Sequence, residues 1–139
     1  MTLYLNINDS YSQVCVTLDE QSTLLNPYYV WQIEDADTNR IYYFTNDDIS
    51  PAPYNYNLFS FSVVPGATYG ATQGIIPATP GQYIYTVYES QFQYNLNIGS
   101  ASDIVELGVM NISGTYSSIA SFTGSNSNII PTFKYNYNN

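Results

Sequence analysis

The stretch Phe59-Ser60-Phe61-Ser62-Val63 alternates strictly between apolar and small polar side chains. Successive side chains of a β-strand point to opposite faces, so this stretch predicts a strand with one buried and one solvated face. Runs with the same period recur along the chain, at residues 2–7, 13–18, 29–34, 40–45, 83–88 and 105–109. Turn-forming Pro, Gly and Asn residues separate these runs, and no segment has a helical period. The sequence therefore predicts an all-β domain.

Short strands in series, separated by turn signals, are typical of small all-β domains. We expect an immunoglobulin-like antiparallel β-sandwich, and a small β-barrel is the second choice. The alternating pattern extends to about Gly114, which places the sandwich domain at residues 1–114. Residues 115–139 are polar and low in complexity, and we interpret them as a C-terminal tail or arm.

The C-terminal segment ends in alternating aromatic residues. A strand-like tip of this kind can order on a partner and add to the edge of the partner's sheet. The candidate partner-contact residues of such an arm are Phe133, Lys134, Tyr135 and Tyr137. A frayed tail is the alternative interpretation.

The charge of the chain excludes two classes of partner. Its net charge is −9, and only Arg40 and Lys134 are positive. Nucleic acids and anionic membranes are bound through Lys and Arg, so we expect neither as a partner. No leader segment and no apolar membrane span are apparent, and we expect the protein to be made in the cytoplasm of its host.

The residues that usually perform catalysis are scarce. The chain has no histidine, and so lacks the usual general base and the usual zinc ligand. Glu34, Glu89 and Glu106 are the candidates for a glycosidase pair, but nothing in their spacing marks two of them as partners. We therefore expect no enzymatic activity, and we predict no catalytic residue, no cofactor and no metal site.

Two acidic segments are better interpreted as turns than as cation sites. Asp35 to Asn39 opens like a calcium loop of the form D-x-D-x-N, but Arg40 replaces the required glycine and Asn46 the required glutamate. A hairpin turn is favoured there, and Asn46-Asp47-Asp48 is interpreted in the same way. The single cysteine, Cys15, lies in an alternating run and is interpreted as a small strand side chain.

The surface composition favours contact with other proteins. The chain has 16 tyrosines and a single lysine, and Tyr is enriched at interfaces from which Lys is depleted. Monomeric β proteins protect their sheet edges with charges, whereas the run from Tyr83 to Tyr88 has high β-propensity and no charge. We expect such an edge to be covered inside a larger assembly. Stacked tyrosines on a sugar-binding face are the minority interpretation.

Several segments, in their order along the chain, carry a family resemblance. They are Leu-Leu-Asn-Pro-Tyr-Tyr at 24–29, the acidic turn at 34–39, Tyr-Tyr-Phe at 42–44, and the segments 56–59, 80–89, 95–96 and 105–108. Between about Leu24 and Gly114 the chain resembles auxiliary (decoration) capsid proteins of crAss-like and related tailed bacteriophages, which have an immunoglobulin-like fold. The C-terminal tail lies outside the resemblance.

The resemblance implies a virion protein on the exterior of the capsid. Its partner would be the major capsid protein, with neighbouring copies or head fibres as further partners, and the family supplies no catalytic residues. The alternative function is a carbohydrate-binding or adhesion domain, such as a head fibre component. A glycosidase-like enzyme is a remote third.

Overall fold

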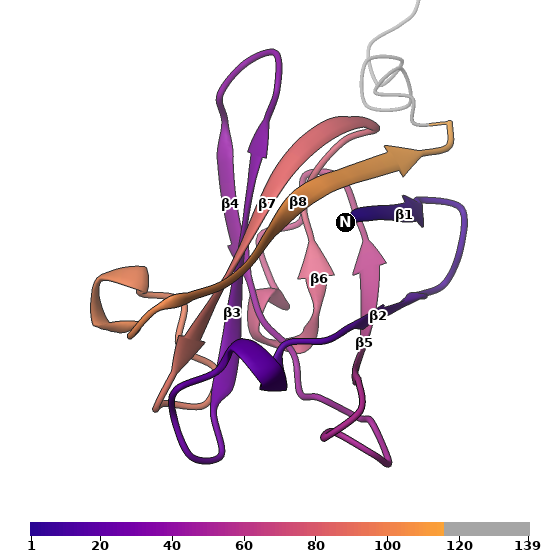
Figure 1. Cartoon of the computed structure of the whole chain (residues 1–139). Helices are drawn as coiled ribbons and strands as arrows, with labels where there is room; N and C mark the ends of the chain where they lie inside the picture. The colour runs from indigo at the N-terminus through magenta and orange to yellow at the C-terminus, as the bar shows by residue number, and fades with distance from the viewer. Residues whose placement is uncertain (116–139) are drawn as a thin grey trace, which may run out of the picture.

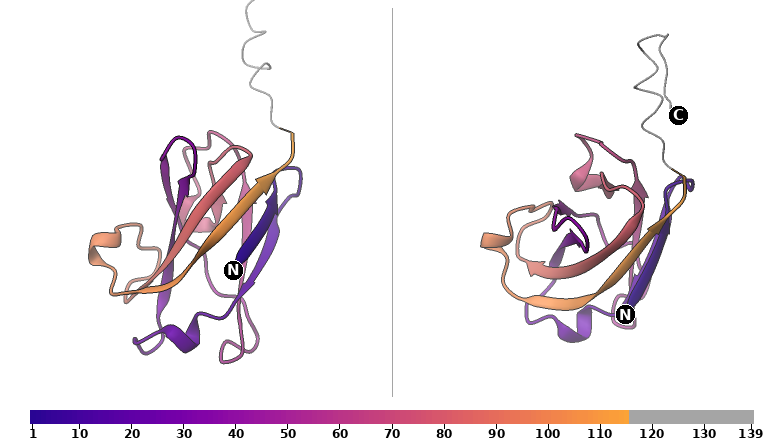
Figure 2. Two further views of the ribbon diagram at one scale, coloured as in Figure 1. Left: turned by 45° about the horizontal axis from the view of Figure 1, so that its top comes forward. Right: turned by 90° about the horizontal axis from the view of Figure 1, so that it is seen from above.

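The computed structural model describes residues 1–115, and the predicted arm at Phe133, Lys134, Tyr135 and Tyr137 lies outside them. Two sheets pack face to face (Figures 1 and 2). The five-stranded sheet contains, in spatial order, β1 (Thr2–Asn6), β8 (Ile104–Ser113), β7 (Gly81–Ser90), β3 (Tyr28–Asp35) and β4 (Ile41–Phe44). The three-stranded sheet contains β2 (Ser12–Val16), β5 (Asn57–Val63) and β6 (Ile75–Ile76). The predicted sandwich is confirmed, and the described strands do not close into a barrel.

Between the strands of residues 1–115 lie three single-turn 3-10 helices: η1 (Asp19–Gln21), η2 (Ala71–Gln73) and η3 (Ile98–Ser100). Among the described residues, no helix has the length and apolarity needed to cross a membrane.

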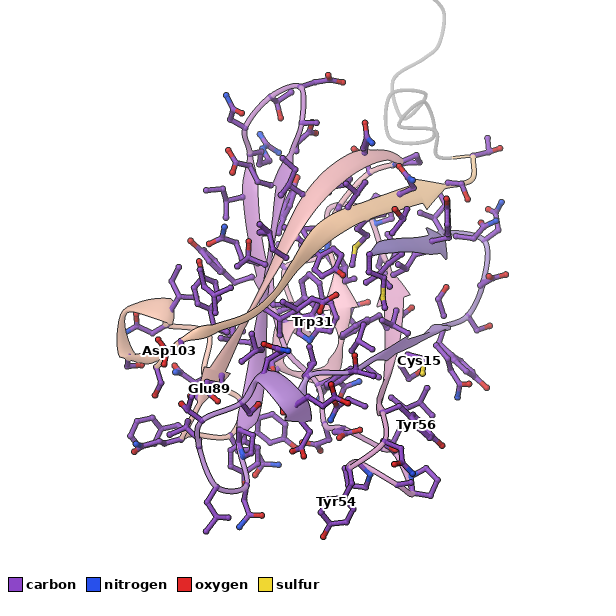
Figure 3. All side chains as sticks on the ribbon, viewed as in Figure 1. Cys15, Trp31, Tyr54, Tyr56, Glu89 and Asp103 are labelled. Atoms are coloured by element: carbon purple, nitrogen blue, oxygen red, sulfur yellow. The ribbon has the colours of Figure 1, made fainter. Side chains whose placement is uncertain are left out.

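The core follows the alternation that the sequence predicts. In β5 the side chains of Phe59, Phe61 and Val63 are buried, and the serines between them are half-exposed. Trp31 of β3 lies at the centre of the core (Figure 3). The centroid of its ring system lies 5.2 Å from the ring centroid of Phe61 and 5.6 Å from that of Tyr85. Aromatic pairs in this range stabilise a core beyond the area that they bury.

Two features of the core are typical of immunoglobulin domains. A buried tryptophan on the third strand is one hallmark, and Trp31 has this position. The tyrosine corner is another: the Tyr83 hydroxyl at the start of β7 donates a 2.8 Å hydrogen bond to the carbonyl of Thr79. Tyr85, two residues later, packs beside Trp31 where immunoglobulin domains have their second cysteine.

The sandwich is mainly antiparallel, but two of the six strand pairs among the described residues are parallel. β1 runs parallel to β8, and β5 runs parallel to β6, whereas the other four pairs are antiparallel. β1 pairs with β8, whereas its sequence neighbour β2 belongs to the other sheet (Figure 2). β6 follows β5 through residues 64–74 rather than through a tight hairpin, which permits the parallel return.

The run from Tyr83 to Tyr88 is not a sheet edge, which corrects the expectation that another molecule covers it. It belongs to β7, which pairs with β3 on one side and with β8 on the other. The strands at the actual edges are β1 and β4 in one sheet and β2 and β6 in the other. None of these four strands contains a charged residue.

Candidate binding cleft

Three connections meet at one end of the sandwich. They are residues 17–27 between β2 and β3, residues 45–56 between β4 and β5, and residues 91–103 between β7 and β8. Figure 3 places Tyr54 at the tip of the second connection and Glu89 where β7 ends. Loops on a rigid sandwich are the usual location of binding residues, and immunoglobulin variable domains use loops at one end in this way.

An open cleft of about 660 Å³ lies among these connections. Its lining combines tyrosines, aspartates and side-chain amides, and it contains no Lys or Arg. The tyrosines and aspartates are Tyr28, Tyr29, Tyr54, Tyr94, Asp19, Asp47 and Asp48. Such a lining can stack against flat or apolar groups, accept hydrogen bonds and attract positive charge.

Asp47 joins the second connection to the third. Its carboxylate accepts a 2.9 Å hydrogen bond from Nε2 of Gln93 and a 2.8 Å bond from the hydroxyl of Tyr94. The bond to Asp47 raises the pKa of Tyr94, because the carboxylate favours the neutral phenol that donates to it. Asp47 therefore connects loops that are distant in sequence.

Asp48 and Asn57 join the second connection to the first. The Asp48 carboxylate accepts bonds from the Leu58 amide at 2.9 Å and from Nδ2 of Asn57 at 2.8 Å. Asn57 is buried, and its Oδ1 accepts the Leu18 amide at 2.7 Å. The corner Asn46-Asp47-Asp48, predicted to be a tight turn between two strands, is instead the start of a 45–56 loop that these bonds hold in place.

Glu89, near the end of β7, holds the first connection in place. Its carboxylate is completely buried and accepts bonds from the Thr23 amide at 2.9 Å, from the Leu24 amide at 3.3 Å and from the Thr23 hydroxyl. A buried carboxylate needs such donors, since an unpaired one would be strongly destabilising. Glu89 thus has a structural role in positioning the loop.

Of the three candidate glutamates of a glycosidase pair, Glu34 is separated from the other two, whereas Glu106 on β8 lies opposite Val87, two residues from Glu89. Glu34 lies opposite Ile84 near the start of β7, whereas Glu89 lies near its end, opposite Tyr29. Glu106 accepts a 2.7 Å bond from the Tyr85 hydroxyl. Each glutamate therefore has a different environment.

The aspartates give the cleft a negative field. The Tyr29 hydroxyl lies 3.0 Å from the Ser22 hydroxyl, and burial raises its pKa, which the charges of Asp19, Asp48 and Glu89 raise further. No cation balances these charges in the lining. The only Lys or Arg of the described residues is Arg40, beside the β3–β4 hairpin at the opposite end of the sandwich.

The other acidic segment is a hairpin turn, as predicted. The Asp35 carboxylate accepts the Asp37 amide at 2.8 Å and the Thr38 amide at 3.3 Å, and these bonds lower its pKa. Within residues 1–115, no group of three or more Cys, Asp or Glu side chains has the arrangement needed to hold a metal ion. Cys15 is exposed on β2 and forms no disulfide.

No family model, curated protein or solved structure matches the chain. The resemblance to auxiliary capsid proteins therefore stays a prediction.

Proposed function

We propose that the protein is an auxiliary (decoration) capsid protein of a tailed bacteriophage, without enzymatic activity. It binds the major capsid protein on the outside of the head and stabilises or covers the shell, and neighbouring copies or head fibres are further partners. The resemblance between Leu24 and Gly114 is what names this assembly. The sandwich supports a contact role because its edge strands carry no charge and an open cleft lies at one of its loop ends.

One observation carries the proposal: none of the four edge strands has a charged side chain. Monomeric β proteins use edge charges, especially Lys, to stop their sheets from pairing with other chains. A protein that works while bound to neighbours has less need of this protection. The uncharged edges therefore favour a protein that is part of an assembly.

A capsid lattice makes weak contacts effective. It repeats one binding site many times, so a contact that is weak in isolation contributes through multivalency where neighbouring copies also touch. Binding stabilises the shell if the protein binds assembled capsid subunits more tightly than free ones. No chemical step is needed for this function.

Binding to heads tests the proposal directly. Purified full-length protein is mixed with heads of the phage that encodes it, after heads have been stripped of the protein, and the mixture is sedimented. We expect saturable co-sedimentation with a fixed number of copies per head, and reconstruction of the particle should place the protein on its outer surface. Protein that stays in the supernatant at concentrations well above those of the capsid subunits would contradict the proposal.

The cleft favours a second candidate, a glycan-binding domain. Tyrosines beside Asp and Asn side chains can stack on sugar rings and bond their hydroxyls. Tyr54 is 84% exposed at the rim and is the best-placed stacking residue. A glycan array tests this alternative. If the protein binds glycans through the cleft, the full-length protein should give a signal that Tyr54→Ala abolishes. An array without any signal would rule the alternative out.

A further inference from the structure

The loop end of the sandwich exposes large apolar side chains around the cleft. Leu25 is 92% exposed, Tyr54 84%, and Phe92, Ile49 and Tyr94 are also exposed. Monomeric proteins seldom gather exposed apolar residues in one region without a binding role. Hydrogen bonds to Asp47, Asp48 and Glu89 also connect these loops, so the surface is preorganised for binding.

The charge of this surface limits what it can receive. Asp19, Asp47 and Asp48 line the cleft, and no Lys or Arg lies among the lining residues. An anionic partner would place like charges beside these carboxylates, which opposes binding. A partner that combines a positive charge with an apolar stem is complementary to both the carboxylates and the tyrosines.

We propose that the cleft receives an arginine or lysine side chain from an exposed segment of the partner protein. The cationic group would lie against the carboxylates of Asp19 and Asp48, and its methylene stem would pack on the rings of Tyr54 and Tyr94. Cations are attracted to the faces of tyrosine rings, and the long stems of Lys and Arg cover apolar surface well. That the partner is the major capsid protein rests on the proposed function.

Binding of variants to heads provides the first test. Tyr54→Ala removes an exposed ring, and Asp19→Asn removes an exposed charge, without breaking a core contact. Tyr11→Ala and Asp37→Asn are matched controls, since Tyr11 is 60% exposed and Asp37 is exposed, and neither lines the cleft. We expect Tyr54→Ala to weaken binding about tenfold or more, as truncation of an aromatic hot spot does. Asp19→Asn should weaken binding by about threefold and reduce its salt dependence.

A second test needs no capsid. Full-length protein labelled with ¹⁵N is titrated with N-acetyl-arginine methylamide, and in parallel with its neutral isostere N-acetyl-citrulline methylamide and with a panel of methyl glycosides. We expect the arginine compound to shift the amide signals of residues 19–29, 45–57 and 93–94, and the citrulline compound to shift them much less. Equal shifts with the two compounds, or shifts with a glycoside alone, would overturn the proposal.

The two tests separate the inference from the proposed function. If heads bind the protein but Tyr54→Ala and Asp19→Asn bind like the controls, the cleft is not the contact and the inference fails while the capsid function stands. If heads bind nothing but the arginine compound still shifts the cleft signals, the capsid function fails and the cationic site stands. If the substitution Lys134→Gln, with no compound added, shifts the amide signals of the cleft residues in the full-length protein, the chain's own C-terminal segment is the occupant and the proposal is wrong.

Discussion

The Tyr85 hydroxyl donates a 2.7 Å hydrogen bond to the carboxylate of Glu106 on the neighbouring strand. Tyr85 is fully buried, and burial raises its pKa above the usual value of 10. The facing carboxylate raises it further, because it accepts from the neutral phenol and would repel a phenolate. The folded state therefore keeps this phenol neutral at a pH at which the unfolded chain has begun to lose the proton.

Alkaline pH should destabilise the protein through this phenol. Burial raises the pKa values of Tyr29 and Tyr83 as well, so their contributions are fully present below pH 10 and are lost as the pH rises beyond it. We expect Tyr85→Phe to make the fall in unfolding free energy above pH 10 shallower, by at most about 1.4 kcal/mol per pH unit for one proton. Urea unfolding followed by the fluorescence of Trp31, the single tryptophan, measures this. The exposed Tyr54→Phe is the control, and equal slopes in the two variants would refute the assignment.

Gly108 provides the space for the Tyr85 ring. A Cβ at this position would lie 2.8 Å from the Cε1 and hydroxyl oxygen of Tyr85, and it would also collide with the carbonyl oxygen of Met1. Gly108→Ala should therefore lower the unfolding free energy by about 1–3 kcal/mol, the usual effect of overpacking. Gly99→Ala is the control, because the nearest atom to its Cβ belongs to the movable side chain of Asn97. Equal urea midpoints for the two variants would show that β1 and Tyr85 can shift to accommodate the methyl group.

Glu89 should contribute to stability through the loop that it holds. Glu89→Ala removes the acceptor of the Thr23 and Leu24 amides and of the Thr23 hydroxyl. We expect a loss of about 2–4 kcal/mol of unfolding free energy, because a buried group left unsatisfied is destabilising. Glu20→Ala, at an exposed position in η1, should change it by less than about 0.5 kcal/mol. If the two variants unfold at the same urea concentration, Glu89 does not have this role.

Most of the strands could be predicted because their information is local. In β5, alternation over a few residues correctly assigns Phe59, Phe61 and Val63 to the buried face; in β3, Val30 is as fully buried as Trp31 although it lies on the opposite face. β6 has only two residues, which is too short to produce a period. The error over Tyr83–Tyr88 has a different cause: alternation identifies a strand but not its neighbours, and pairing with β3 and β8 places this one inside the sheet.

The cleft could not be predicted, because its bonds join residues far apart in the chain. Thr23 and Glu89 are separated by 66 positions, and Asp47 and Tyr94 by 47. No local pattern encodes these pairs, and each acidic or polar residue taken alone resembles an ordinary turn residue. A usable signal exists only after the strands are paired, when three connections rich in Tyr, Asn and Asp come to the same end of the sandwich.

Asp47 should determine the order of the cleft more than the stability of the fold. Its bonds to Gln93 and Tyr94 lie at the surface, where hydrogen bonds contribute little to the free energy of unfolding. Asp47→Ala should therefore unfold at nearly the same urea concentration as the unaltered protein, yet the amides of residues 91–97 should exchange hydrogen faster. Its removal should also return the pKa of Tyr94 toward 10, since the carboxylate is the main cause of the increase.

Asp37→Ala, in the β3–β4 hairpin, is the matched control for this variant and should leave both measurements unchanged. Hydrogen exchange by mass spectrometry and ¹³C NMR of labelled tyrosine rings supply the two measurements. If exchange in 91–97 is unaltered while the Tyr94 pKa falls, the bond exists but does not order the loop. The loop would then depend on the internal bonds of Ser90, Asn95 and Ser100, which are independent of Asp47, and the cleft would keep its shape without the bond between the two loops.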